Sequence, residues 1–227
     1  MSRGRRVAPK PAEEPSTKGE RTRERLFQAA ISEFSAKGFE GASMREIARR
    51  AEVSPGLLYR YFDAKEDVVR ELYARLSAQW AERGKALPAG TWTQRAIWLT
   101  RNSLEVLQGH RDVLRSMLGT ILSGLDELNP PDNAYSRAHV QPLFAQAVQG
   151  AVDAPAEAGE LAHALYLGHL MLLLFWLVDR TPKQRATQEL LASVELSAPL
   201  IGGALAMPMV RAGLDQFTAT VRKGLLG

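Results

Sequence analysis

The 227-residue sequence contains no cysteine. A disulfide framework and a thiolate metal site are therefore excluded, and the chain suits a reducing compartment. Residues 1–20 include basic residues but lack the apolar segment of a secretory signal. We therefore expect a cytoplasmic protein.

The sequence also lacks any stretch in which apolar and polar residues alternate over the length of a strand, so it predicts no β-sheet. Apolar residues instead recur at helical spacing in one segment after another. They make up 45% of the chain and charged residues 24%, which is ordinary for a soluble globular protein. These patterns predict an all-α fold.

The excess of positive charge is small, with a net charge of +4 at pH 7. Residues 1–70 hold 15 Lys and Arg against 11 Asp and Glu, whereas the rest of the chain holds 14 of each. A DNA-binding segment shows such an excess because phosphate contacts supply most non-specific DNA affinity. The alternative is a chance imbalance.

Residues 1–18 are rich in Pro, Arg, Glu and Ser, which predicts a disordered basic arm. Arg3, Arg5 and Arg6 could enter a minor groove, as basic arms of other DNA-binding proteins do. A solvated tail with no fixed contact is the alternative.

A first helix is predicted from residue 20, and Gly38, directly after Lys37, is placed to end it as a C′ residue. Two shorter helices are expected to pack against it. The core of this three-helix head is predicted to consist of Phe34, Phe39, Ile47, Val53, Leu57 and Phe62.

Residues 43–65 predict two short helices joined by a tight turn. Ser43 suits the N-cap of the first helix, and Glu46 stands three residues later to close a capping box. Ser54 suits the N-cap of the second helix, and Pro55 occupies its first position, where a missing N–H costs nothing. Such a helix-turn-helix usually reads DNA.

Residues 20–75 resemble the DNA-binding head of the TetR (tetracycline-repressor-like) family of bacterial regulators. The matching residues, in order and without a gap, are Phe34-x-x-Lys37-Gly38-Phe39-x-Gly41-Ala42-Ser43, Arg45-Glu46-Ile47-Ala48, Val53-Ser54-Pro55-Gly56-x-Leu58-Tyr59-x-Tyr61-Phe62 and Lys65-Glu66. Beyond Leu76 only the helical layout matches.

The resemblance implies an all-α fold with an N-terminal three-helix helix-turn-helix head on a larger helical ligand-binding and dimerisation domain, about nine to ten helices in total. We expect a disordered arm over residues 1–18, a DNA-binding domain over 19–66 and an effector-binding and dimerisation domain over 67–227.

Phosphate contacts are implied for four residues whose hydroxyl, phenol and ammonium groups are usual donors to DNA: Ser43, Tyr59, Tyr61 and Lys65. Such contacts set the register without reading sequence. For the two tyrosines, packing within the head is the alternative.

Six further residues are candidates for the groove itself: Arg45, Ser54, Pro55, Gly56, Leu58 and Arg60. Gly56 lets the backbone approach a base edge, and Pro55 offers an apolar face to a thymine methyl. Arg45 or Arg60 could form a bidentate pair with guanine, and either could equally hold a phosphate.

Residues 161–178 form a run of 18 residues without a charge. Such a run suits a membrane span, a helix buried on all sides, or half of a dimer interface. Two histidines and Gly168 argue against the span. We therefore expect no contact with a membrane. Because family members dimerise through their last helices, we expect a homodimer formed through residues 157–178 and 183–206.

Family members usually bind a small effector inside the larger domain and then release DNA. An apolar or aromatic effector would suit the side chains that could line such a cavity here, although ordinary core packing is the alternative for each. These candidates are Trp92, Trp98, Met117, Phe144, His163, Tyr166 and His169.

Enzyme function has no positive support in the sequence. Glu160 and His163 have the Glu-x-x-His spacing of di-iron bundles, but no second copy is present, so we expect no metal and no cofactor. No Ser/His/Asp set or phosphate-cradling Gly loop is apparent.

The sequence thus predicts a homodimeric transcriptional repressor that binds double-stranded, palindromic operator DNA and is released by a small-molecule effector. The alternatives are an activator or effector-independent DNA binder with the same head, and a membrane-associated helical protein.

Overall fold

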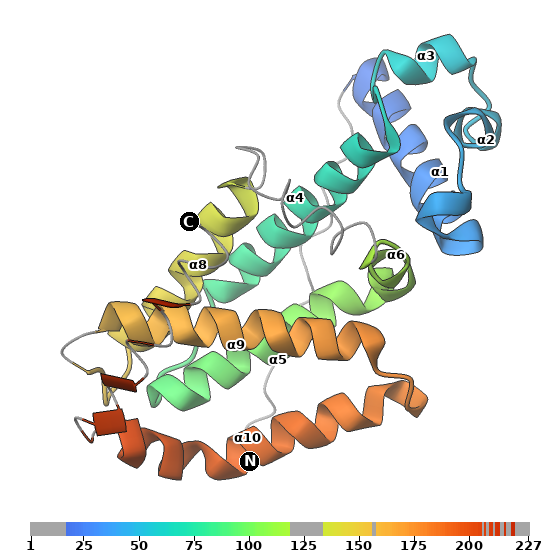
Figure 1. Cartoon of the computed structure of the whole chain (residues 1–227). Helices are drawn as coiled ribbons and strands as arrows, with labels where there is room; N and C mark the ends of the chain where they lie inside the picture. The colour runs from blue at the N-terminus through green and yellow to red at the C-terminus, as the bar shows by residue number, and fades with distance from the viewer. Residues whose placement is uncertain are drawn as a thin grey trace, which may run out of the picture. The chain divides into compact units, whose positions relative to one another are not determined.

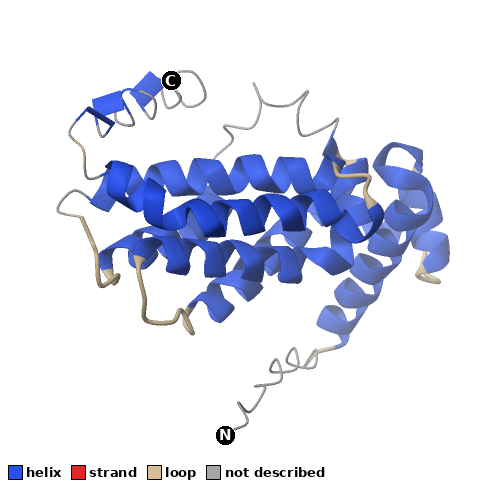
Figure 2. Cartoon of the chain, turned by 90° about the horizontal axis from the view of Figure 1, so that it is seen from below, coloured by secondary structure: helices blue, strands red, loops and turns tan. Residues whose placement is uncertain are grey.

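The fold is described from a computed structural model, which defines residues 17–118, 134–155 and 158–205 and, beyond them, residues 207, 209, 210, 212, 213, 216, 219 and 220. Within these residues all regular structure is helical, so the predicted all-α fold is confirmed (Figure 2). The expected arm, except for its last two residues, lies outside the described residues.

The chain divides into two compact units, one ending at Val68 and the next beginning at Val69. Three helices make up most of the first unit, which we call the head (Figure 1). They are α1 (Lys18–Gly41), α2 (Met44–Arg50) and α3 (Pro55–Tyr59).

Helix α1 is closed at its beginning by a full capping box. The Thr17 hydroxyl accepts the Glu20 N–H at 3.1 Å, and the Glu20 carboxylate accepts the Thr17 N–H at 2.8 Å. Near its end, Gly38 has a φ of 74°, a conformation that side-chain-bearing residues rarely adopt. The expected break at Gly38 is confirmed, and one further helical turn leads to Gly41.

The N-caps predicted for α2 and α3 are both present. The Ser43 hydroxyl accepts the Glu46 N–H at 3.3 Å, and the Ser54 hydroxyl accepts the Leu57 N–H at 3.2 Å. The capping box predicted for α2 is wrong in its second half. The Glu46 carboxylate accepts the Ser43 hydroxyl and the Lys37 ammonium instead of the Ser43 N–H.

The core of the head differs from the prediction at α3, where Leu58 is fully buried and Leu57 only half-buried. The Phe62 N–H bonds to the Leu58 carbonyl at 3.0 Å, so these two side chains share one face four residues apart. Burial of Phe62 therefore brings Leu58 inward and turns Leu57 outward. The buried apolar side chains of the head include Leu26, Phe27, Phe34, Phe39, Ile47, Leu58 and Phe62.

The second unit is a helical bundle in which α8 packs along α9 and across α5, and α10 lies against α5 and α9 (Figure 1). Its core includes Trp80, Leu99, Phe144, Val148 and Trp176. The helices are α4 (Lys65–Gly84, which begins in the head), α5 (Trp92–Leu107), α6 (Arg111–Ser116), α8 (Ala134–Gln149), α9 (Ala158–Val178) and α10 (Arg185–Leu205).

Two buried charged residues fix the turn between α9 and α10. The Arg111 guanidinium donates to the carbonyls of Trp176 at 2.8 Å and Asp179 at 2.6 Å, which gives the end of α9 the partners it otherwise lacks. The Asp179 carboxylate accepts hydrogen bonds from the N–H and hydroxyl groups of Thr181 and Thr187. These bonds, led by that of the Thr181 hydroxyl, hold the pKa of Asp179 well below its usual range.

Replacing Leu58 with Ala should lower the free energy of unfolding by about 2–5 kcal/mol, because it leaves a cavity in the core of the head. The matched change Leu57→Ala should cost less, since that side chain is partly solvated. Urea unfolding followed by circular dichroism measures both. A larger loss at Leu57 would restore the side-chain register predicted from the sequence.

Replacing Arg111 with Met should lower the free energy of unfolding by about 1–3 kcal/mol, because the carbonyls at the end of α9 lose their donors while buried. Arg115→Met, at an exposed position on the same helix, is the control and should change stability by at most about 0.5 kcal/mol. Equal effects in denaturant titrations would show that the Arg111 hydrogen bonds contribute nothing specific.

Candidate nucleic-acid interface and apolar cavity

The exposed surface of α2 and α3 carries most of the predicted DNA-binding residues. Tyr59 is 48% exposed. The side chains of Arg45 and Arg60 form no hydrogen bond or ion pair with the described part of the chain, so both guanidinium groups are available to a ligand. Exposed among the predicted residues are Ser43, Arg45, Ser54, Pro55, Gly56, Tyr59 and Arg60.

Gly56 has no role in the packing of the head. A Cβ atom added there would meet nothing within 4 Å, and its φ lies outside the range that favours glycine. The free head would therefore accept a larger residue. A glycine that the fold does not require fits a surface to which another molecule must come close.

Leu58 does not belong to this surface. Its side chain is fully buried in the core of the head, so the prediction that it reaches the groove is wrong. The sequence predicts Leu57 to be the buried leucine of α3, whereas the structure buries Leu58 and leaves Leu57 half-buried.

Tyr61 and Lys65 are half-buried and are engaged within the head. The Lys65 ammonium donates to the Phe39 carbonyl at 2.8 Å and lies 4.6 Å from the centre of the Phe39 ring. The Tyr61 carbonyl accepts the Arg23 guanidinium at 3.2 Å. Lys65 thus joins the start of α4 to the end of α1, whatever contact it also makes with DNA.

An ionic network that the sequence analysis missed joins α1 to α2. The buried Glu33 carboxylate accepts the Arg50 guanidinium at 2.6 Å and lies 3.3 Å from the Lys37 ammonium, which also pairs with Glu46. The hydrogen bond from Arg50 is the main cause of the lowered pKa of Glu33, and it outweighs the effect of burial. A carboxylate next to Phe34 on the buried face of α1 was the available signal.

A largely apolar cavity of about 360 Å³ lies between α5, α8, α9 and α10. No charged side chain lines it. Its walls are formed by Trp92, Thr93, Ala96, Ile97, Thr100, Phe144, Leu161, Ala164, Leu165, Gly168, His169, Leu172, Leu191, Val194 and Ala198.

The structure brings only three of the seven predicted effector-contacting residues into this cavity: Trp92, Phe144 and His169. Four others lie elsewhere. Trp98 lines a neighbouring groove, while Met117, His163 and Tyr166 line neither space. Helical spacing explains the division, because Trp98 on α5 cannot share the face of Trp92 and Ala96.

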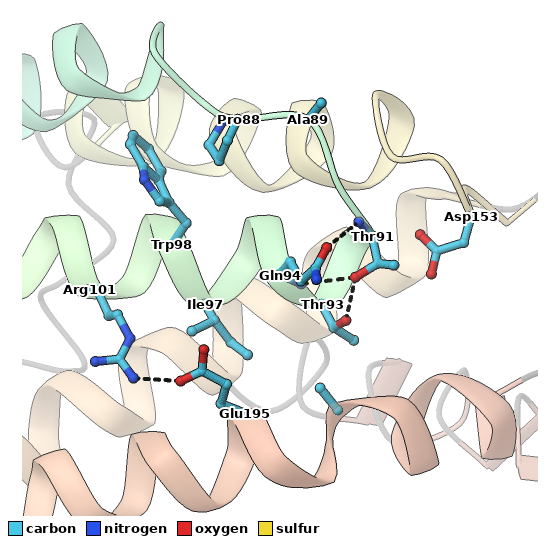
Figure 3. A pocket seen from close by; sticks show the side chains of 11 residues that line it. Pro88, Ala89, Thr91, Thr93, Gln94, Ile97, Trp98, Arg101, Asp153 and Glu195 are labelled. Carbon is cyan, nitrogen blue, oxygen red and sulfur yellow. Dashed lines mark hydrogen bonds and ion pairs between the residues drawn. The ribbon is translucent and has the colours of Figure 1, made fainter. Parts of the chain in front are cut away.

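The neighbouring groove, of about 690 Å³, is more polar and shares Thr93, Ile97 and Ala198 with the cavity. Figure 3 shows Arg101 of α5 and Glu195 of α10 pointing toward one another, with 2.7 Å between their charged groups. The pair neutralises both charges at the edge of this groove.

His169 is the most unusual residue of the cavity. It is 3% exposed, its ring stacks on Trp80 with 4.9 Å between centres, and its Nδ1 atom has no hydrogen-bond partner. Burial lowers the pKa of His169 to about 3, so the side chain is neutral near pH 7. Among the described residues no cluster of His, Asp and Glu is arranged to hold a metal ion.

The outer face of α9 and α10 carries exposed apolar side chains. Met171 is 66% exposed on α9, and Leu196 and Leu200 are 83% and 77% exposed on α10. By length and composition alone, α9 would be able to cross a membrane, with a mean hydropathy of 1.9. Within the described residues, these apolar side chains of α9 and α10 are left uncovered.

Comparison with known proteins identifies the head. Residues 26–72 match the family described as bacterial regulatory proteins, tetR family. The transcriptional repressor KstR of Rhodococcus jostii is 28% identical over 182 residues, which cover 77% of this chain and 81% of KstR. The transcriptional regulator TcmR of Streptomyces glaucescens is 29% identical over 52% of this chain and 46% of its own length.

Solved structures share the fold of the chain. A tetR-family regulator from Streptomyces coelicolor has a TM-score of 0.59 at 20% identity, with 88% of this chain and 89% of that chain covered. The regulator FadR from Bacillus subtilis, solved with stearoyl-CoA, has a TM-score of 0.56 at 16% identity over 75% of this chain and 96% of its own. The helix-turn-helix geometry and these matches agree: residues 26–72 carry the DNA-binding domain of the tetR family of bacterial regulatory proteins, and the chain is similar to regulators of that family.

Proposed function

We propose that the protein is a cytoplasmic, homodimeric repressor whose head binds a palindromic operator and releases it when an apolar effector binds. In this proposal residues 19–66 read DNA, and residues 67–227 dimerise and bind the effector. The capped α2–α3 unit carries the proposal, because it presents Arg45, Gly56 and Arg60 to solvent, and their side chains have no partner among the described residues. The similarity to a repressor, KstR, supports the direction of regulation.

Within the head we assign two kinds of contact. Hydroxyl and ammonium groups of Ser43, Tyr59, Tyr61 and Lys65 hold phosphates and fix the position of α3 on the duplex. Groove contacts come from the remaining exposed residues, with a guanidinium able to pair with guanine and the Pro55 ring able to touch a thymine methyl. These are Arg45, Ser54, Pro55, Gly56 and Arg60.

A second copy of the chain is needed for specificity. Helix α3 has five residues, which contact too few base pairs to specify an operator alone. Two heads about one helical turn of DNA apart would read the two halves of a palindrome. The exposed apolar face of α9 and α10 is the surface through which we propose that the copies meet.

Release of the operator follows if an effector binds preferentially to the conformation in which the two heads are wrongly spaced. The cavity in the second unit supplies an apolar site for such a molecule. The FadR structure supports this assignment, since a regulator with the same fold was solved with stearoyl-CoA.

Selection of random double-stranded oligonucleotides by the full chain should enrich a palindrome. Gly56→Leu should bind the selected site at least about tenfold more weakly, because the side chain enters the space that a base edge would occupy. Its unfolding midpoint should not fall, since that space is empty in the free head. The control Gly109→Leu, in the second unit and equally free of neighbours, should bind normally.

Failure to enrich any palindrome would overturn the repressor proposal. Normal operator binding by a folded Gly56→Leu variant would show that α3 does not lie in the groove.

Met171→Glu should weaken self-association at least about tenfold, because dimerisation would bury an unpaired carboxylate in an apolar face. Operator affinity should fall with it. Gln149→Glu adds the same charge at an exposed position on α8 and should leave the dimer intact. Analytical ultracentrifugation measures the association, and an unaffected dimer would place the interface elsewhere.

A further inference from the structure

His169 lines the cavity between α5, α8, α9 and α10, and its ring forms no hydrogen bond with the described residues. We propose that this cavity binds an uncharged, mostly apolar small molecule whose hydroxyl or carbonyl group forms a hydrogen bond with His169. The inference rests on the proposed function only in treating that molecule as the effector, and the cavity can be tested without DNA.

The walls of the cavity set the charge and polarity of its occupant. They are formed by aliphatic and aromatic side chains, together with Thr93, Thr100 and His169. The Thr100 hydroxyl already donates to the Ala96 carbonyl at 2.9 Å. A carboxylate or an ammonium group would find no opposite charge here, and burying it unpaired is costly. The nearest ion pair, Arg101 with Glu195, lines the neighbouring groove and is already neutralised.

His169 sets the hydrogen-bonding requirement. A neutral imidazole has one donor and one acceptor nitrogen, and Nδ1 is buried without a partner. Because no hydrogen bond with the described residues uses this ring, a ligand group that reaches one of its nitrogens from the cavity supplies a missing hydrogen bond. A hydroxyl can donate or accept and therefore suits either form of the ring, while a carbonyl suits the form that donates. Stacking on Trp80 and the close approach of Phe144 hold the ring in place.

The space is large enough for a small molecule and is not filled by the chain itself. Its volume of about 360 Å³ lies within the usual range for ligand pockets of about 300–1,000 Å³. Gly168 contributes to the opening, because a Cβ atom added there would meet nothing within 4 Å. The cavity also extends inward from α9 and α10 to Trp92 and Phe144, both of which are buried.

Isothermal titration calorimetry on the DNA-free full chain at pH 7 provides the test, with 1-decanol, decanoate and decylammonium as probes of equal chain length. Decanol should bind at least about tenfold more tightly than either ion, because only the ions must bury a charge. Equal or tighter binding of decanoate or decylammonium would overturn the assignment of an uncharged ligand. Failure of all three probes to bind would show that the cavity is closed, for example by a second copy of the chain, and would also overturn it.

His169→Phe separates a ligand contact from a structural role. The variant keeps a flat ring against Trp80 and removes the unpartnered nitrogen, so its unfolding midpoint should stay equal or rise. Its affinity for decanol should fall about 3- to 10-fold, the value of one net hydrogen bond. His110→Phe is the control, because Nδ1 of His110 is also buried without a partner but does not line the cavity. Unchanged decanol binding by His169→Phe would remove His169 from the site.

Gly168→Leu provides a second test that does not depend on the histidine. The new side chain fills the cavity without a clash and should abolish decanol binding, whereas Gly159→Leu on the same helix, also free of neighbours, should not. Retained binding by Gly168→Leu would place the ligand elsewhere. If decanol binds as expected but the operator is not released, the cavity assignment stands and the effector-release part of the proposed function fails.

Discussion

The head depends on the stabilisation of α3, a helix that is too short to be stable by itself. Helix α3 has five residues, fewer than a helix needs to persist alone in water. Its conformation is imposed by the Ser54 cap at one end and by burial of Leu58 and Phe62 on the other side. The polar face of α3 can therefore remain free of internal partners. The stability of this unit and its proposed contacts with DNA thus use opposite faces of the same short segment.

The second unit contains buried polar side chains with hydrogen-bond partners and others without them. Arg111 and Asp179 are buried charged residues, and each has several hydrogen-bond partners that fix the α9–α10 turn. His169 is buried to the same degree but has an unpartnered nitrogen. Buried polar groups in folded proteins are normally paired. His110 and His163 also have an unpartnered buried nitrogen, so what distinguishes His169 is its place in the wall of the cavity.

Caps, glycine breaks and helical periodicity could be predicted from sequence because they depend on neighbours along the chain. Ser43, Ser54 and Gly38 were placed correctly for that reason. The choice between Leu57 and Leu58 could not be predicted, because both are leucines and only the tertiary packing of the head decides which of them turns inward. The partner of Glu33 lies 17 residues away, and the lining of the cavity comes from four helices. Such contacts depend on tertiary packing, which helical spacing alone does not determine.

The cavity and the exposed apolar face share two helices, α9 and α10. Val194 lines the cavity and is 40% exposed, and Gly168 lines the cavity while lying on the surface of α9. A molecule in the cavity therefore contacts side chains that a second copy of the chain would also meet. If that molecule binds one packing of α9 against α10 more tightly than another, it also favours one geometry of the proposed dimer. A population shift requires such a difference in affinity between two conformations. Under the proposed function, this shared wall would let an uncharged ligand act on the apolar interface between two copies of the chain.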